Sequence, residues 1–194
     1  MDITPIVLNR TEASILKIKI TTALIQRASH MNIKILDKSD QKSVHEIIEI
    51  GYPKNIEYID ELLSWTCDPN WPIAGSIYRY FRELGKKEVH NVLKVAEAAD
   101  FDWRYSLITQ VISSYDNEIL NECVSSLKKW ATQTGSEECD FESIRILTDN
   151  ELIPASEIST IAKRNLFIYN VWIKETLEAS GKAIYSFPLG EHKL

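Results

Sequence analysis

The sequence contains few cysteines and no long apolar run. Its three cysteines, Cys67, Cys123 and Cys139, are odd in number, and no pair has the Cys-x-x-Cys spacing of zinc and redox sites. Reduced thiols are the simplest interpretation. No apolar stretch approaches the roughly 20 residues that a membrane-spanning helix needs. Because the first residues also lack the basic and apolar regions of a secretory signal, we expect a soluble, cytoplasmic protein.

The sequence motifs of common active sites are missing as well. Neither a glycine-rich phosphate loop nor a Gly-x-Ser-x-Gly elbow occurs in the chain. The four histidines, His30, His45, His90 and His192, are scattered, and none has a second ligand at metal-binding spacing. We therefore expect a protein that is not an enzyme and that holds neither a cofactor nor a metal.

Positive charge is in deficit. The chain has 22 basic and 28 acidic residues, which gives a net charge of −6. A surface of this sign repels phosphate backbones, so nucleic-acid binding is disfavoured, and it attracts a basic protein partner. The sequence leaves the identity of that partner and the oligomeric state open.

The first thirty residues require separate treatment. Ala28-Ser29-His30-Met31 resembles the junction that a cloning vector leaves before an insert, and Met31 would serve as a natural start. Residues 1–30 are therefore either vector-derived or native, and such segments are kept out of fold reasoning. Without them the chain keeps 18 basic and 26 acidic residues, so the acidic excess remains.

From residue 39 onward, apolar residues recur at the spacing of amphipathic helices. Ser39 or Asp40 is suited to cap the first helix and Gly51 ends it. Pro72 suits the first position of the third helix, Gly85 ends that helix, and Asp100 can cap the fifth. The expected helices cover about 40–50, 56–65, 72–84, 89–99, 101–112 and 117–130.

Short connections between these helices favour antiparallel neighbours, each pair leaving an apolar face for the next pair. This pattern is typical of a mainly α, HEAT-like stack, to which we assign residues 31–150. Residues 151–194 form a C-terminal extension. Its run 166–173 is apolar on all sides, which predicts either a buried helix, our preference, or a strand paired with 183–187.

One segment carries a family resemblance. Leu62-Leu63-Ser64-Trp65-Thr66-Cys67-Asp68-Pro69-Asn70-Trp71-Pro72 resembles the Leu-Leu-x-Trp-x-x-Asp-x-Asn-Trp-Pro signature of a bacterial domain of unknown function. Asp102-Trp103-Arg104-Tyr105 resembles the second landmark of that family, with arginine in place of lysine. The likeness covers roughly residues 38–150. It implies HEAT-type helical repeats and supplies no catalytic residues.

The up-down order of the helices also predicts a candidate site. Because two helices separate the turn at 67–71 from the turn at 99–102, both turns should emerge at the same end. The candidate binding residues on them are Asp68, Asn70, Trp71, Asp100, Asp102, Trp103 and Arg104. Trp and Arg dominate interface hot spots. The alternative is purely structural, with helix caps, core tryptophans and an Arg104–carboxylate pair.

The leading hypothesis from these observations is a protein-binding module without catalysis. Small acidic proteins with such domains are similar to the immunity proteins that bacteria pair with toxins, so the most concrete version neutralises a cognate toxin. An adaptor or scaffold domain is the first alternative. The second is an enzyme whose site forms in the C-terminal extension, around Arg164, Tyr169 or Glu175.

Overall fold

A computed structural model describes residues 33–180 of the chain. The segment 1–30 and the stretch 183–187 lie outside the described residues. Within 33–180 the regular elements are all helical, which confirms the prediction of a mainly α protein. The α-helices are α2 (Gln41–Ile50), α3 (Ile59–Ser64), α4 (Ala74–Leu84), α5 (Val89–Ala98), α6 (Phe101–Gln110), α7 (Asn117–Ala131), α8 (Cys139–Asp149) and α9 (Ala155–Ala179). Three 3-10 helices cover Ile56–Tyr58, Gly85–Lys87 and Ile112–Ser114.

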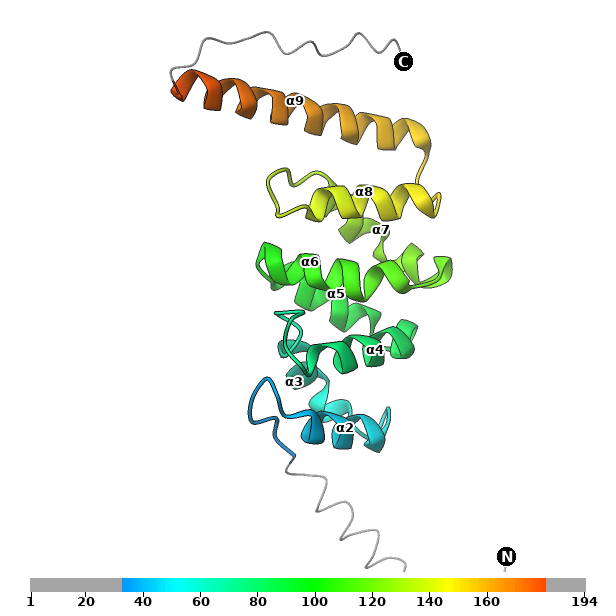
Figure 1. Cartoon of the computed structure of the whole chain (residues 1–194). Coiled ribbons are helices and arrows are strands. Elements are labelled where there is room, and N and C mark those ends of the chain that lie inside the picture. The colour runs from blue at the N-terminus through cyan, green and yellow to red at the C-terminus, as the bar shows by residue number, and fades with distance from the viewer. Residues whose placement is uncertain (1–32, 181–194) are drawn as a thin grey trace, which may run out of the picture.

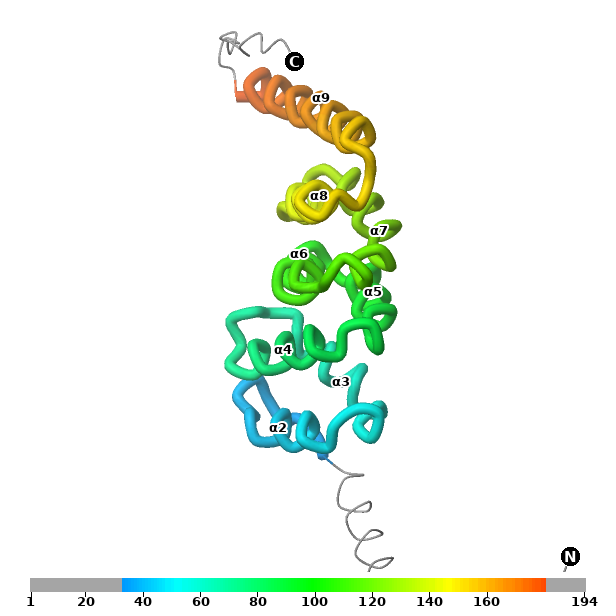
Figure 2. The backbone as a smooth tube through the Cα atoms, turned by 90° about the vertical axis from the view of Figure 1, so that its right-hand side faces the viewer, coloured from blue at the N-terminus to red at the C-terminus, as the bar shows by residue number. Residues whose placement is uncertain are grey.

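The helices form an elongated pile (Figure 1). In the view turned by 90°, α2, α4, α6 and α8 lie above one another in one column, and α3, α5 and α7 form a second column (Figure 2). Helix α5 contacts α6 and α7, and α8 contacts the same two helices. Helix α9 lies across the end of the pile, on α8.

Capping residues fix where several helices begin. The carboxylates of Asp40, Asp100 and Asp116 each accept a backbone N–H three residues further on, at the starts of α2, α6 and α7. Each bond satisfies one of the N–H groups that the first turn of a helix leaves unpaired. Gly85 ends α4 with a φ of +51°, a conformation that glycine adopts without steric cost. The helix boundaries predicted from Asp40, Gly51, Gly85 and Asp100 are therefore confirmed. The prediction that Pro72 occupies the first position of the third helix is wrong, because α4 begins only at Ala74.

The second predicted helix is shorter than the pattern indicates. Residues 56–58 form a 3-10 turn, and α3 begins only at Ile59. Ile56 lies before that start, so its side chain is 58% exposed instead of joining the apolar face. The side chain of Asn55 is fully buried and donates to the Ile47 carbonyl and the Tyr80 hydroxyl, which holds the chain in a turn at this point.

One hydrophobic core runs through the pile. It extends without interruption from Ile35 at one end to Ile161 in α9. Its largest fully buried side chains are those of Trp130, Tyr78, Phe81, Ile47, Ile59, Leu62, Leu63, Ile73, Ile77, Leu107, Ile108 and Ile112. Each layer buries the apolar face of the next, which is why single helix pairs of this kind are not stable alone.

The last two helices differ from the sequence-based expectation. Helix α8 buries Cys139, Asp140, Ser143, Ile146 and Leu147, whereas Phe141 is 54% exposed. The run 166–173 lies within α9, so it is not a strand. The expectation that this run is buried is wrong: Leu166, Phe167 and Ile173 are more than half exposed. None of the helices in 33–180 is both long and apolar enough to cross a membrane.

Candidate functional site

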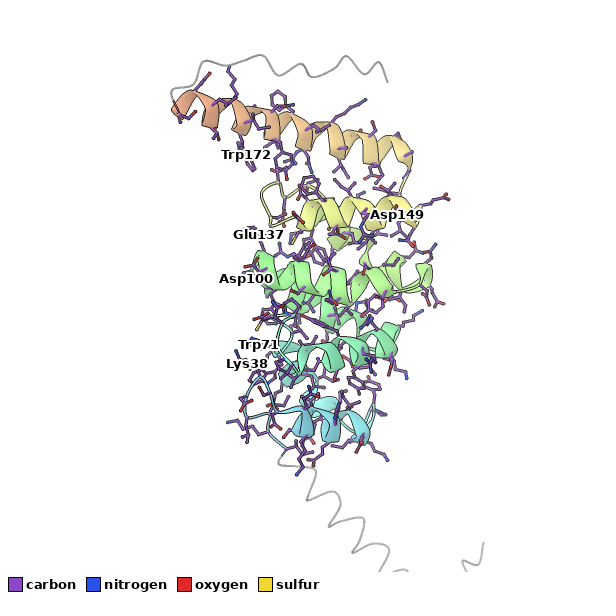
Figure 3. The ribbon with its side chains drawn as sticks, in the orientation of Figure 1. Lys38, Trp71, Asp100, Glu137, Asp149 and Trp172 are labelled. Atoms are coloured by element: carbon purple, nitrogen blue, oxygen red, sulfur yellow. The ribbon has the colours of Figure 1, made fainter. Side chains whose placement is uncertain are left out.

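The loops that join successive layers gather along one side of the pile, which we call the loop edge and define as residues 33–40, 65–73, 99–103 and 132–138. In Figure 3, Lys38, Trp71, Asp100 and Glu137 lie one above another on this side, and Asp149 lies on the opposite side. The prediction that the turns at 67–71 and 99–102 emerge at the same end is therefore confirmed.

Hydrogen bonds connect each loop of the edge to the next. The Gln41 side chain donates to the Pro72 carbonyl at 3.1 Å, which joins the first two loops. The Trp103 indole donates to the Thr66 hydroxyl at 2.8 Å and joins the second to the third. The Cys139 thiol donates to the Phe101 carbonyl and joins the third to the start of α8. The edge is thus held in one geometry before any partner arrives, which lowers the entropic cost of binding.

Five acidic residues lie in the three later loops of the edge, and none of them is within 4 Å of a basic side chain among residues 33–180. Asp100, Asp102, Glu137 and Glu138 are exposed and Asp68 is half-buried. Glu97 and Glu122, outside the edge, do lie within 4 Å of a basic side chain. Within the described part of the chain, Asp37 and Asp40 of the first loop, like Asp116 on the opposite side, do not. Asp68 and Asp100 instead accept backbone N–H groups from Asn70 and Trp103.

The charge balance of the edge is strongly negative. Its four loops contain seven acidic and two basic residues, a net charge of −5. The loops of the opposite side, residues 51–58, 85–88, 111–116 and 149–154, contain five acidic and three basic residues, a net charge of −2. A partner with positive charge is therefore attracted toward the loop edge in preference to the other side.

Aromatic side chains lie between these carboxylates. Trp71 is half-buried, and its ring lies 5.4 Å from that of Trp65. Trp103 is also half-buried, and Phe101 is 43% exposed between Asp100 and Asp102. Half-exposed aromatic rings offer a partner a large contact area with little loss of side-chain freedom.

Arg104 does not belong to this surface. It was expected among the exposed binding residues, or paired with a carboxylate, and the structure corrects both expectations. Its side chain is only 6% exposed and donates to the carbonyls of Ala96, Glu97 and Ala99 at 2.8–3.3 Å. A fourth bond reaches the side-chain oxygen of Gln133 at 3.0 Å. Arg104 therefore fixes the C-terminal end of α5 from inside the molecule.

The structure adds residues that the sequence pattern did not single out. Glu137 and Glu138 have φ values of +49° and +65°, and both are exposed in the loop before α8. Non-glycine residues in this region are strained, and such strain concentrates at functional sites. Phe101 could have been noticed from its position between two aspartates. No comparable signal marks Glu137 and Glu138, because backbone strain cannot be read from residue types.

Burial keeps the three cysteine thiols protonated at neutral pH. Burial raises the pKa of Cys67, and the charges of Asp68 and Asp100 raise it further. Burial raises the pKa of Cys123 to about 12 and that of Cys139 to about 11. All three cysteines are free, and no group of three potential metal ligands occurs between residues 33 and 180. Such thiols are poor nucleophiles at neutral pH.

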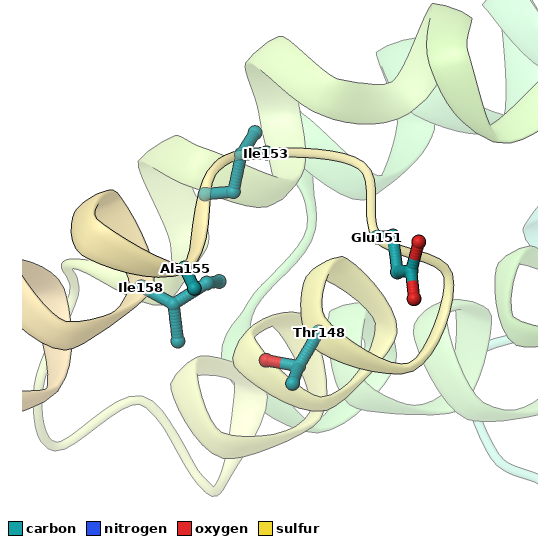
Figure 4. Close-up of a pocket in the computed structure, with 5 residues that line it drawn as sticks. All are labelled: Thr148, Glu151, Ile153, Ala155 and Ile158. Carbon is teal, nitrogen blue, oxygen red and sulfur yellow. The ribbon is translucent and has the colours of Figure 1, made fainter.

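The three C-terminal residues considered for an active site do not line a common pocket, although Arg164 and Tyr169 both donate to acceptors around the end of α7 and the start of α8. A pocket of about 330 Å³ lies between α8 and α9, lined by Thr148, Glu151, Ile153, Ala155 and Ile158 (Figure 4). Arg164, Tyr169 and Glu175 are absent from its lining. Arg164 and Glu175 are eleven residues apart on α9, about 16 Å along its axis.

Comparison with known proteins identifies a family for most of the chain. A family model described as a domain of unknown function, DUF5071, matches residues 35–150. The match spans α2 to α8, almost the same residues as the motif resemblance, and ends before α9 begins. No curated protein and no solved structure matches the chain.

Proposed function

We propose that this chain, which belongs to the DUF5071 family of domains of unknown function, binds another protein through its loop edge and performs no catalysis. The observation that carries the proposal is the row of five carboxylates without ion-pair partners, interleaved with half-exposed aromatic rings. Unpaired acidic charge on a rigid edge recruits a basic partner and orients its approach. The aromatic rings between the charges provide the contact area that holds it.

The architecture suits this role. The two columns of helices support our interpretation of the chain as a HEAT-like stack, a kind of repeat that presents an extended face to a partner. In such a stack the interior serves packing, and recognition is left to the loops and edges. The hydrogen bonds between successive loops of this chain give it such an edge, already ordered.

The most concrete form of the proposal is an immunity protein that covers the active surface of a basic bacterial toxin in the cytoplasm. Toxins that cleave nucleic acids need positive surfaces, and an acidic edge of fixed shape is complementary to such a surface. An adaptor or scaffold protein could use the same edge. The two roles differ in whether the partner is toxic to the cell when expressed alone.

The test uses five conservative substitutions that remove charge and keep shape: Asp68→Asn, Asp100→Asn, Asp102→Asn, Glu137→Gln and Glu138→Gln. The partner is the product of the gene immediately upstream, purified and titrated calorimetrically. We expect the wild type to bind it and the five-fold variant to bind at least tenfold more weakly. Five rim charges at about 0.3–1 kcal/mol each exceed the 1.4 kcal/mol that a factor of ten requires.

A matched control removes charge from the opposite side with Asp116→Asn, Asp149→Asn and Glu151→Gln. This variant should bind within about twofold of the wild type. Because the control removes three charges against five, a loss of binding free energy in the control of about three-fifths of that in the five-fold variant would show that only net charge matters and would refute the loop edge. If no product of a neighbouring gene binds, the toxin-neutralising form is abandoned; binding that does not protect cells from the partner favours the adaptor.

A further inference from the structure

Helix α9 has an unusual distribution of polarity. Of its 25 residues only Ile161 and Asn165 are buried. Its outward side exposes Leu166 by 61% and Phe167 by 70%, and Ile173 is 52% exposed. A helix at the end of a stack normally buries its apolar side and exposes its polar side. The apolar contacts of α9 are confined to one side, where Ile161 joins the core and the Tyr169 ring stacks on Phe141 with 5.6 Å between the ring centres.

Polar bonds also hold α9 in place. The Tyr169 hydroxyl donates to Oδ2 of Asp140 at 2.5 Å. Nδ2 of Asn165 donates to the Ala131 carbonyl at 2.8 Å, and Nη1 of Arg164 donates to the Thr132 carbonyl at 2.8 Å. These acceptors are the last carbonyls of α7 and a carboxylate at the start of α8. Three donor side chains of α9 thus occupy one acceptor-rich patch.

The patch is not fully satisfied by α9. The Asp140 carboxylate is 0% exposed, and its Oδ1 has no hydrogen-bond partner among residues 33–180. The Ser136 hydroxyl in the preceding loop is also buried without a partner. Asp140 takes part in no ion pair within the described chain, although a buried carboxylate without a cation is costly. The carboxylate therefore has capacity for a stronger donor than α9 supplies.

The connection between α8 and α9 is strained and loosely packed. Glu151 adopts a φ of +52° in the connecting loop, a strained conformation for glutamate. The 330 Å³ pocket leaves Thr148, Ile153 and Ile158 incompletely packed around this loop (Figure 4). The family match covers residues 35–150 and therefore does not include α9, which begins at Ala155. Residues 150–154 are therefore the segment at which α9 would turn if it left the pile.

We propose that α9 is a displaceable cover, and that the patch beneath it binds an arginine side chain of a basic partner. Asp140 together with the carbonyls of Ala131 and Thr132 presents a carboxylate and the negative end of a helix, which suits the planar, five-donor guanidinium group. The donors of α9 occupy these acceptors until a partner displaces them. The choice of a basic partner rests on the proposed function; the displacement of α9 does not.

The first measurement is hydrogen exchange of the full chain, which requires no partner. Peptides from residues 156–168 should exchange at least tenfold faster than peptides from α4 and α7. We choose residues 156–168 because simple fraying of α9 from its C-terminal end would not speed exchange in these residues, whereas displacement of the whole helix would. Exchange of α9 at the same rate as α7 and α8 would overturn the proposal, since α9 would then be a fixed part of the stack.

A release variant, Asn165→Ala with Tyr169→Phe, removes two of the donors to the patch. It should raise exchange of residues 156–168 at least fivefold further and leave α4 unchanged. Tyr169→Phe alone, which keeps the aromatic ring, should give a smaller rise in the same residues. The control is Phe167→Ala on the exposed side of α9, which should leave these rates within about twofold of the wild type. A rise in every helix would indicate general destabilisation and contradict the cover.

The binding arm uses a capped hexa-arginine peptide and the full-length chain. The release variant should bind the peptide at least fivefold more tightly than the wild type, because the acceptors are free in a larger fraction of molecules. Adding Asp140→Asn to the release variant should abolish this increase in affinity. For a hexa-lysine peptide, the increase in affinity from the wild type to the release variant should be smaller than for hexa-arginine. If α9 is released and no gain appears, the arginine site is refuted while the loop edge is unaffected. Neutralising the loop edge should weaken peptide binding by the wild type and by the release variant to the same extent. The ratio of their two affinities should therefore stay unchanged.

Discussion

Arg104 shows how one side chain can be placed by the fold against the expectation from its type. Arginine beside a tryptophan and an aspartate is typical of an interface, yet here the guanidinium lies within the molecule. It satisfies three carbonyls at the end of α5 and reaches Gln133 in the loop before α8. It also lies 5.5 Å from the Phe101 ring and 5.7 Å from the Trp130 ring. Its contribution is therefore to stability.

Replacing Arg104 with alanine should lower the free energy of unfolding by about 3 kcal/mol, because buried carbonyls lose a charged donor. Arg104→Lys should recover only part of this loss, since one ammonium cannot reach carbonyls and Gln133 together. Urea denaturation measures both. The exposed Arg79→Ala is the matched control, with an expected change within about 0.5 kcal/mol. A loss below 1 kcal/mol for Arg104→Ala would contradict the buried role.

The buried thiols make stability depend on alkaline pH. Unfolded cysteine loses its proton near pH 8.5, whereas burial raises the pKa of Cys123 to about 12 and of Cys139 to about 11. Between these values the unfolded chain binds fewer protons than the folded one, so stability is complete below pH 8.5 and falls as pH rises. The loss should approach roughly 1.4 kcal/mol per pH unit for each thiol between pH 9 and 10.

The measurement is urea denaturation of the reduced protein from pH 7.5 to 10. Cys123→Ala removes one of the two buried thiols and should reduce the slope of stability against pH by about a third to a half. The variant will also lose some stability at every pH, which the slope does not register. An unchanged slope would show that the Cys123 thiol does not contribute.

At the scale of elements, the turns of the loop edge perform two tasks at once. The side chain of Asp100 accepts the Trp103 N–H at 2.9 Å and so begins α6, while its charge faces the solvent. Asp102, two residues later, is exposed and carries charge without a capping bond from its side chain. The two roles of an edge carboxylate can therefore be separated by choosing the substitution.

Asp100→Ala should lower the free energy of unfolding by about 1 kcal/mol, since the first turn of α6 loses its cap. Asp100→Asn should cost only a few tenths, because the amide oxygen still accepts the N–H of Trp103. Asp102→Ala is the control, expected within about 0.5 kcal/mol. Thermal or urea denaturation distinguishes these outcomes, and equal losses for Asp100→Ala and Asp100→Asn would mean that charge, not capping, stabilises α6.

At the scale of the whole molecule, we expect the pile to unfold as a unit because its core has no break. Buried apolar side chains follow one another from Ile35 to Ile161, and each layer contacts the next. Stacks of this type couple neighbouring layers strongly enough for cooperative unfolding when no interface is weak. The exception is α9, which polar bonds hold in place.

Phe81→Ala in α4 and Trp130→Ala in α7 remove fully buried side chains from different layers. Each should cost about 3–5 kcal/mol and shift one common transition, since the cavity destabilises the whole coupled stack. Helical circular dichroism and tryptophan fluorescence should report the same midpoint for Phe81→Ala. Two separate transitions in either variant would show that the layers unfold independently.

Local chemistry in the sequence was sufficient to determine the helices. Asp40, Gly51, Gly85 and Asp100 set boundaries that the structure confirms, because a cap or a breaker acts within one turn. The up-down order of six helices also placed the turns at 67–71 and 99–102 on one side. The acidic excess was visible in composition alone. Each of these properties depends on neighbouring residues or on totals.

Tertiary packing decided the rest. Distant elements decide whether the Arg104 side chain contacts water or the carbonyls of α5. They also decide whether the apolar run 166–173 is covered. A 3.6-residue period shows that a helix has an apolar side, but it cannot show what covers that side. Asp140 illustrates the limit most clearly, because a carboxylate at the start of a helix reads as a solvated charge. It is fully buried, and two side chains of α9 donate to it from 25 and 29 residues further along the chain.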